Sequence, residues 1–352
     1  MSTLTEAAFV SKKAFFWSVV GISVIIGGLI FLGIGKRIKN ALFPPPPAPA
    51  TVAFGKLPTV ELGAGYKAPA GTTFVLDTIT GGFGDFGAYA KVFGVRAPEA
   101  SFGAFERIKT KAESIHFGGT PQEISPGTFR FVDTRDENRI LTVDTVSENF
   151  TLETDYLVDT DILNVRPQSE QEAVDTAVAF FENLGTDLRD FPADKVKVRK
   201  LRIDGAILSE TPALANTNLI EVNFYRRNLD EVPVYWAVEK EASISVLVSA
   251  RDVVFAKYNP TRVMLNKFAT YSLRPPALAF EDLKMGKGAF NKQLANSEVA
   301  IIDVSLGYVE SEETRGYLAP FYIFKDRGDL YGYVPAVDPI WLESPASPGP
   351  AN

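Results

Sequence analysis

An uncharged stretch near the start of the chain limits its architecture more than any other feature. Residues Ala14–Gly35 contain no charged side chain, and basic residues flank them on both sides. At about 1.5 Å per residue, a helix over this stretch is about 33 Å long, enough to cross a hydrocarbon core of about 30 Å. We therefore expect residues 1–13 to form a short tail and residues 14–35 to form a transmembrane helix.

A cleaved signal peptide is the alternative interpretation of this stretch. Signal peptides have apolar cores of about 7–15 residues, followed by a cleavage site between small residues. The stretch here is longer, basic residues follow it directly, and the nearest A-x-A pattern is Ala48–Ala50. The sequence thus favours a retained anchor that binds the lipid bilayer. The lysines on both flanks do not by themselves decide the orientation in the membrane.

The composition excludes several classes of function. The chain has no cysteine and a single histidine, His116. A disulfide framework, a thiolate metal site, a cysteine nucleophile and a multi-histidine metal site are therefore all excluded within one chain. Beyond residue 40 there are 31 basic and 42 acidic residues, a net charge of −11. Such an acidic region repels nucleic acid, and no cofactor is expected.

Proline-rich segments mark the ends of the folded region. Phe43–Pro49 reads FPPPPAP, which favours a stiff polyproline II spacer within a linker over residues 36–71. Residues 343–352 are rich in proline and serine, and we expect a disordered tail there. Between them we expect two α+β domains, residues 72–165 and residues 166–342, the second with two helix-plus-strands units.

Three segments have the apolar spacing of helices. The clearest is Glu170–Leu184, with Ser169 as N-cap and Gly185 as stop; Ala104–Phe117 and Pro276–Met285 are the others. Runs with alternating polarity follow each of them, which predicts strands. No long parallel crossover is visible. The pattern α-β-β-β thus occurs three times and predicts an α+β fold of antiparallel sheets, each packed by a helix.

Several segments carry a resemblance to a known kind of protein. They are Asn223–Trp236 (NFYRRNLDEVPVYW), Tyr271–Gly288 (YSLRPPALAFEDLKMGKG), Val299–Val309 (VAIIDVSLGYV) and Leu318–Val337 (LAPFYIFKDRGDLYGYVPAV). The chain resembles bacterial membrane-anchored extracytoplasmic proteins with PepSY-like repeats, similar to regulators of an essential cell-wall sensor kinase. The resemblance implies a non-enzymatic binding domain outside the membrane and supplies no catalytic residue. With it, we expect a cytoplasmic N-terminus and an extracytoplasmic C-terminal domain.

Two features of the sequence suggest a nucleotide-binding or catalytic site, but both lack the surrounding pattern that such a site requires. Gly82–Gly87 matches G-x-G-x-x-G, but a dinucleotide loop must open a helix, and Ala88–Val95 alternates like a strand. His116 lies near the end of a predicted helix, without a recognisable serine or aspartate arrangement. We therefore predict a glycine-rich turn and a helix-end histidine.

Three clusters of acidic residues are interpreted as solvated loops or hairpin tips. They are Asp155, Asp159 and Asp161; Asp187, Asp190 and Asp194; and Glu310, Glu312 and Glu313. Oxygen-rich loops can bind Ca²⁺, but the spacing of an EF-hand is missing, so calcium binding stays open.

Aromatic residues on the predicted strands are the best candidates for contact with a partner. Neighbouring side chains on a strand face opposite sides, so core packing accounts for many of them. An exposed sheet edge or groove can also recruit an extended peptide. The candidates are Tyr225, Tyr235, Trp236, Tyr322, Tyr331 and Tyr333.

These features together predict a single-pass, membrane-anchored, extracytoplasmic protein of the bacterial cell envelope. We expect it to bind another membrane or envelope protein and to regulate or scaffold it, without catalysis. A homo-oligomer stays open. The alternatives are a cell-envelope hydrolase that uses acidic residues and a structural surface or stalk subunit.

Overall fold

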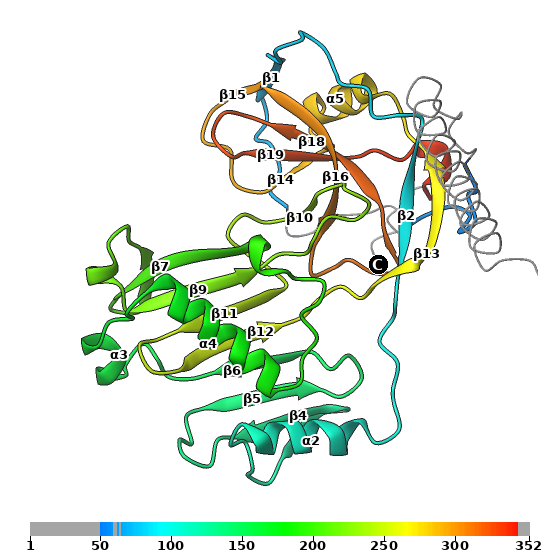
Figure 1. Cartoon of the computed structure of the whole chain (residues 1–352). Coiled ribbons are helices and arrows are strands. Elements are labelled where there is room, and N and C mark those ends of the chain that lie inside the picture. Colours follow the sequence, from blue (N-terminus) through cyan, green and yellow to red (C-terminus); the bar gives the residue numbers. More distant parts are fainter. Residues whose placement is uncertain (1–49, 59–61, 63–64, 344–352) are drawn as a thin grey trace, which may run out of the picture. The chain divides into compact units, whose positions relative to one another are not determined.

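A computed structural model describes residues 50–58, 62 and 65–343. It is an α+β fold in which sheets predominate over a few helices (Figure 1). The expected transmembrane helix, Ala14–Gly35, and the tail after residue 343 lie outside the described residues. Among the residues that are described, no helix is long and apolar enough to cross a membrane.

The largest element is a sheet of nine strands, all paired antiparallel. In spatial order its strands are β3 (Gln122–Ser125), β4 (Thr128–Val132), β5 (Ile140–Asp144), β6 (Phe150–Glu153), β12 (Val253–Tyr258), β11 (Ile244–Val248), β9 (Leu219–Phe224), β7 (Val196–Asp204) and β8 (Ile207–Glu210). The strands that follow the first predicted helix join those that follow the second where β6 pairs with β12. One sheet thus crosses the predicted domain boundary at residue 165.

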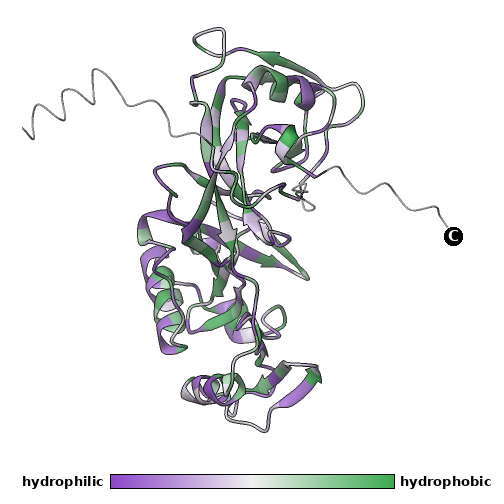
Figure 2. Ribbon diagram, turned by 90° about the vertical axis from the view of Figure 1, so that its right-hand side faces the viewer, coloured by the Kyte–Doolittle hydropathy of each residue, from purple (hydrophilic) through white to green (hydrophobic). Residues whose placement is uncertain are grey.

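Two helices, α2 (Ala104–Ser114) and α4 (Glu170–Asn183), cover the same face of this sheet (Figure 1). Their apolar residues form one core with the inward side chains of the strands, for example Ala112 and Phe181 with Phe150. The short helix α3 (Thr160–Asn164) packs Ile162 against the opposite face. Figure 2 shows hydrophobic and hydrophilic residues interspersed along the helices and strands, as expected of elements with one buried side.

The predicted start and stop signals of α4 are confirmed. The Ser169 hydroxyl accepts a hydrogen bond of 3.1 Å from the backbone N–H of Glu172, which satisfies one of the free donors of the first turn. After the helix, Gly185 adopts a positive φ of 60°, and its N–H donates to the carbonyl of Glu182. Local capping chemistry therefore sets both ends of this helix.

A second sheet, of five strands, contains most of the C-terminal part of the chain. Its order is β10 (Val234–Trp236), β16 (Asp303–Glu310), β18 (Pro320–Lys325), β19 (Tyr331–Pro335) and β14 (Ala289–Phe290). Helix α5 (Pro276–Lys284) packs Phe280 and Leu283 on one of its faces. The third predicted helix and its following strands are thus present.

Strand β10 departs from the expected meander. The sequence pattern predicts that Val232–Glu239 continues the sheet of the second unit. Instead the chain leaves the nine-stranded sheet after β9, pairs in parallel with β16 of the five-stranded sheet, and returns as β11. The expectation of purely antiparallel sheets is therefore wrong at this place. Alternating polarity predicts a strand but not its partner.

Two small sheets complete the described part. β1 (Thr73–Leu76) pairs in parallel with β15 (Glu298–Ile301). β2 (Tyr89–Val95) lies between β13 (Val263–Ser272) and β17 (Tyr317–Leu318). The strands at the start of the predicted first domain therefore pair with strands from the end of the chain.

A buried arginine ties the two large sheets together. Arg226 follows β9 and its side chain is 2% exposed. Its Nε donates to the carboxylate of Glu310, at the end of β16, over 2.6 Å, and its Nη1 to Asp190 over 3.1 Å. Its Nη2 donates to the carbonyl of Thr261, just before β13. Burial raises the pKa of the Glu310 carboxyl, and Arg226 counteracts this.

Replacing Arg226 by methionine should destabilise the fold by about 3–5 kcal/mol, because it leaves Glu310 buried without a partner. The loss should grow as the pH rises from 5 to 8. Without the arginine, burial keeps the folded-state pKa of Glu310 raised, so the variant is most stable below the unfolded pKa and loses stability as the pH rises. Urea unfolding of the intact chain measures both effects.

Two further variants check this interpretation. The double variant R226M/E310M should recover most of the lost stability, since no charge then stays buried. R202M removes an exposed arginine paired with Asp204 and should change stability little. Equal losses in R226M and R202M would contradict a structural role for the buried pair.

Candidate functional site

Five of the six predicted contact aromatics line one groove. Its volume is about 410 Å³, and it lies between the ends of β7 and β9 on one side and strands β10 and β19 on the other. The aromatic lining residues are Tyr225, Tyr235, Trp236, Tyr331 and Tyr333. We call this the aromatic groove.

The free edge of β10 lies along the aromatic groove. The N–H of Tyr308 donates to Pro233, and the N–H of Ala237 donates to the carbonyl of Glu310. Alternation along the strand therefore turns the backbone groups of Val234 and Trp236 away from β16. The Trp236 carbonyl accepts a hydrogen bond from the Tyr333 hydroxyl at 3.4 Å. The remaining groups have no backbone partner in the described part of the chain, and they form an edge of the kind that adds an extended peptide strand.

Tyr235 lies flat on the sheet because residue 307 is glycine. A Cβ atom built on Gly307 would lie 2.7 Å from Cε2 of Tyr235 and 2.9 Å from Cγ1 of Ile323. The Tyr235 and Tyr331 rings meet edge to face, with centroids 5.6 Å apart. The ammonium of Lys325 lies 5.7 Å from each ring centroid. The glycine, the rings and the cation thus hold the floor of the groove in one arrangement.

The groove offers two accessible neutral phenols, those of Tyr225 and Tyr331, as hydrogen-bond donors. Burial raises the pKa of Tyr225 to about 12, and it raises the pKa of Tyr331 and of Tyr333. All three phenols therefore stay protonated at neutral pH. Tyr225 and Tyr331 are half-buried, so one side of each ring is accessible, whereas Tyr333 is buried.

The lining of the aromatic groove has four basic residues, Lys195, Lys197, Arg226 and Lys240, and two acidic ones, Asp194 and Glu239. The Lys197 ammonium lies 5.2 Å from the centre of the Tyr225 ring, and the Lys195 ammonium donates to the side-chain oxygen of Asn228. Neither lysine has a carboxylate within ion-pair distance among the residues described. Lys240, by contrast, pairs with Glu210 at 2.7 Å. The groove thus combines apolar faces, phenol donors and two lysines without acidic partners.

Tyr322 lies away from the groove. In the pairing of β18 with β19, Ile323 stands opposite Tyr333 and Tyr322 opposite Val334. Tyr322 therefore points to the other face of the sheet, where it packs under α5, and its hydroxyl donates to the carbonyl of Arg274 at 2.7 Å. Only 1% of it is exposed, so it offers no surface to a partner.

Two of the acidic clusters have structural roles. The Asp159 carboxylate caps α3 by accepting hydrogen bonds from the N–H groups of Asp161 and Ile162. Asp190 binds Arg226 and Arg227. Glu310, interpreted with Glu312 and Glu313 as a hairpin tip, is the last residue of β16, just before the turn; it is 3% exposed and held by Arg226. Among the described residues, no group of three or more acidic or histidine side chains could hold a metal ion.

One pair of carboxylates lies in a shallow pocket of about 320 Å³ on the other face of the nine-stranded sheet. Burial raises the pKa of Glu221, whereas a hydrogen bond from Lys240 lowers the pKa of Glu210. Arg199 contacts both carboxylates. Each carboxylate of this pair already binds a cation, so neither is free to act as the acid or base of a hydrolase.

The glycine-rich turn has the predicted structure. Gly81 and Gly87 adopt positive φ angles, and the chain continues from Gly87 into strand β2 without a helix. His116 follows the end of α2, and its carbonyl accepts a hydrogen bond from the N–H of Thr134.

Comparison with known proteins gives no family. No protein-family model and no curated protein matches the chain. One similar solved structure is an uncharacterized protein from Eubacterium rectale, with 12% identity and a TM-score of 0.38 over 70% of this chain and 82% of that chain. The C-terminal domain of YpeB from Bacillus megaterium has 11% identity and a TM-score of 0.31 over 68% of this chain and 95% of that chain. YycH from Bacillus subtilis has 14% identity and a TM-score of 0.33 over 71% of this chain and 55% of that chain. Likeness at this level carries no conclusion about function.

Replacing Gly307 by alanine should displace the Tyr235 ring, because the new methyl group would overlap it. We expect a loss of about 1–3 kcal/mol in unfolding free energy, the usual cost of overpacking. The double variant G307A/Y235A should lose less than the sum of the single variants. Gly82→Ala is a matched control, since a Cβ there meets nothing within 4 Å. Additive losses would show that the glycine and the ring are not coupled.

Proposed function

We propose that this chain is an anchored binding protein of the bacterial cell envelope, which holds an extended segment of another membrane or envelope protein in the aromatic groove and thereby regulates or scaffolds it. The proposal includes the single-pass anchor at Ala14–Gly35 and an extracytoplasmic position of the folded region. It assigns no reaction to the chain.

The observation that carries the proposal is the meeting of an unpaired strand edge with aromatic side chains in one groove. Backbone groups of β10 would supply affinity for an extended segment, and we expect its alternate apolar side chains to pack against Tyr225, Tyr235 and Tyr331, which line the groove. Aromatic residues dominate the binding energy of many protein interfaces. Lys195 and Lys197 favour a segment with an acidic residue next to its apolar ones.

The sequence supports the membrane part of the proposal. The uncharged stretch has the length of a membrane-spanning helix, and consecutive prolines such as those after it are typical of a stiff spacer between an anchor and a folded region. An anchored binding site meets its partner in the same membrane at a high effective concentration.

The two alternative functions, a hydrolase and a structural subunit, would depend on other features of the structure. A hydrolase that used Glu210 and Glu221 would need them to exchange protons with a substrate, although Arg199 and Lys240 hold them. A structural subunit would use the aromatic groove or a sheet edge to bind a second copy of the chain.

A photo-crosslinking amino acid at position 225 or 331 of the full chain should give one common adduct with another envelope or membrane protein, because both positions face the same groove. Position 66 is the control, since Tyr66 is exposed at 43% and lies outside the groove. Illumination of intact cells, followed by mass spectrometry of the adducts, measures this.

The G307A substitution should weaken the common adduct, because it disturbs the floor of the groove. An adduct between two copies of the chain would support the structural subunit instead. Equal yields of the same adduct from position 66, or no effect of G307A, would contradict the proposed site.

A reporter fused after Asn352 should be active only outside the cytoplasm, and the mature chain should retain residues 14–35 by mass. The same fusion without residues 1–35 should stay in the cytoplasm, since it lacks the segment that directs translocation. Reporter activity inside the cell from the complete chain would overturn both the orientation and the envelope location.

A further inference from the structure

A second cavity, of about 600 Å³, has a wall of arginines. It lies between the α4–β7 loop, the residues after β9 and the start of β13. Its basic lining residues are Arg96, Arg189, Arg226, Arg227 and Arg262, with Asp187 and Asp190 as its acidic residues. We call it the arginine cleft. With Glu310, which binds Arg226 from outside this lining, it has a local excess of two positive charges in a region of the chain that is acidic overall.

Three of the arginines are already neutralised. Arg189 donates two hydrogen bonds to the Asp187 carboxylate, from Nε at 2.9 Å and from Nη2 at 2.7 Å. These bonds lower the pKa of the Asp187 carboxyl to about 2. Arg226 and Arg227 share Asp190. These pairs form the frame of the cleft.

Arg96 and Arg262 have no carboxylate within ion-pair distance among the residues described. The Arg262 guanidinium has five donors, of which one binds the carbonyl of Ser147 and the others have no protein partner within the described ranges. Both arginines are exposed to solvent in the cleft. Free guanidinium groups that share a cavity are the usual means of binding phosphate or carboxylate.

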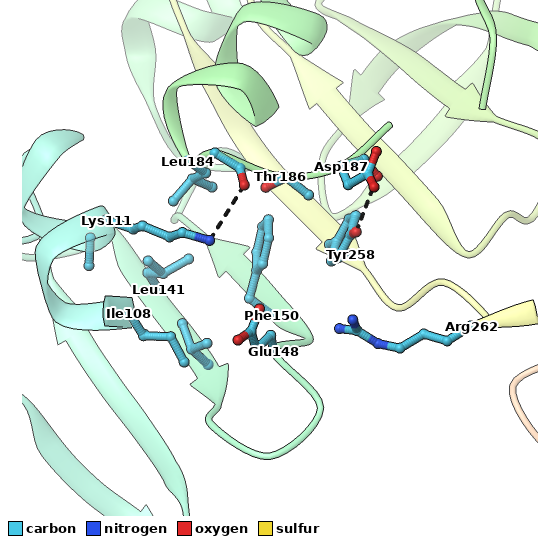
Figure 3. A pocket seen from close by; sticks show the side chains of 13 residues that line it. Ile108, Lys111, Leu141, Glu148, Phe150, Leu184, Thr186, Asp187, Tyr258 and Arg262 are labelled. Carbon is cyan, nitrogen blue, oxygen red and sulfur yellow. Dashed lines mark hydrogen bonds between the residues drawn. The ribbon is translucent and has the colours of Figure 1, made fainter. Parts of the chain in front are cut away.

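An apolar pocket adjoins the cleft (Figure 3). It has a volume of about 140 Å³ and lies between α2, the strands β5 and β6, and the end of α4. Its apolar lining includes Ile108, Leu141, Phe150 and Leu184. The Lys111 ammonium lies at its mouth, where it donates to the carbonyl of Gly185 at 3.4 Å and has no carboxylate partner among the described residues.

The two cavities share Asp187, Tyr258 and Arg262. Figure 3 shows the Arg262 side chain extending toward Phe150 and Glu148 from the side opposite Lys111. The Arg107 guanidinium lies 3.5 Å from the carboxylate of Glu148 and partly neutralises its charge. A molecule with its apolar end between Ile108 and Phe150 would therefore place a negative group next to Arg262, at the entrance of the arginine cleft.

We propose that the apolar pocket and the arginine cleft together form a binding site for a small amphipathic anion, with one apolar group attached to a phosphate or carboxylate. The size of the pocket limits the apolar group. A cavity of about 150 Å³ holds one benzene molecule, so a phenyl ring or a branched alkyl group of similar size fills this pocket. The site lies outside the aromatic groove and does not rest on its proposed role.

Phenyl phosphate, inorganic phosphate and phenol separate the two parts of the site. Each is titrated into the full chain, held in nanodiscs of zwitterionic lipid, by isothermal calorimetry. Phenyl phosphate should bind about ten-fold or more tightly than inorganic phosphate, because its ring is buried in the pocket. Phenol, without a charge, should bind more weakly than phenyl phosphate. Benzoate replaces phenyl phosphate in a second series and distinguishes a carboxylate from a phosphate ligand.

Arg262→Gln should weaken phenyl phosphate binding about ten-fold, since it removes a charged donor to the anion. Lys111→Gln should also weaken it. Arg130→Gln is the matched control, because Arg130 is likewise an exposed arginine but lies outside both cavities. It should leave binding unchanged. The exposed positions of Arg262 and Arg130 make these two variants compatible with folding.

Three results would overturn the proposal. One is equal affinity for inorganic phosphate and phenyl phosphate, which would leave only a general attraction of anions. Another is an R262Q variant that binds phenyl phosphate and benzoate as the unaltered chain does. The third is an equal loss in R130Q, which would place the effect in the overall charge and not in this site.

Discussion

The rest of the structure depends on one buried cation, Arg226. It joins the residue after β9 in the nine-stranded sheet to Glu310 at the end of β16 in the five-stranded sheet. The same guanidinium holds Asp190 and the carbonyl of Thr261, so four segments converge on it. It also lines both the aromatic groove and the arginine cleft. The wall that separates the two candidate sites is therefore made by an interaction that the fold requires.

A buried ion pair is a costly way to join two sheets, since both charges must leave water. Apolar contacts would give comparable stability, but they tolerate sliding. A guanidinium has five donors in a fixed plane, and here three different acceptors occupy it. Its geometry is satisfied in one arrangement of the segments. That arrangement places β10 against β16 and leaves the other edge of β10 along the groove.

The sequence predicts the parts of this fold that local chemistry determines. Ser169 and Gly185 mark the ends of α4 because capping and positive φ are properties of single residues. The partner of β10 is a different matter, since alternating polarity assigns a strand its faces but not its neighbour. Glu310 is similar: its sequence neighbours Glu312 and Glu313 suggest an exposed turn, and only the approach of Arg226 shows why it is buried.

The residues of the aromatic groove could largely be predicted from local sequence, whereas the arginine cleft depends on contacts between distant segments and could not. Tyr331 and Tyr333 are two residues apart on one strand and therefore share a face, while Tyr322 pairs with Val334 and falls on the opposite one. The exposed arginines of the cleft are at positions 96, 189, 227 and 262, so no window of sequence contains more than one of them. The net charge of −11 beyond residue 40 gives no sign of a positively charged cleft. The pairing of β2 with β13, and the hydrogen bond from Arg226 after β9 to Thr261 before β13, bring these positive charges together where the composition indicates the opposite.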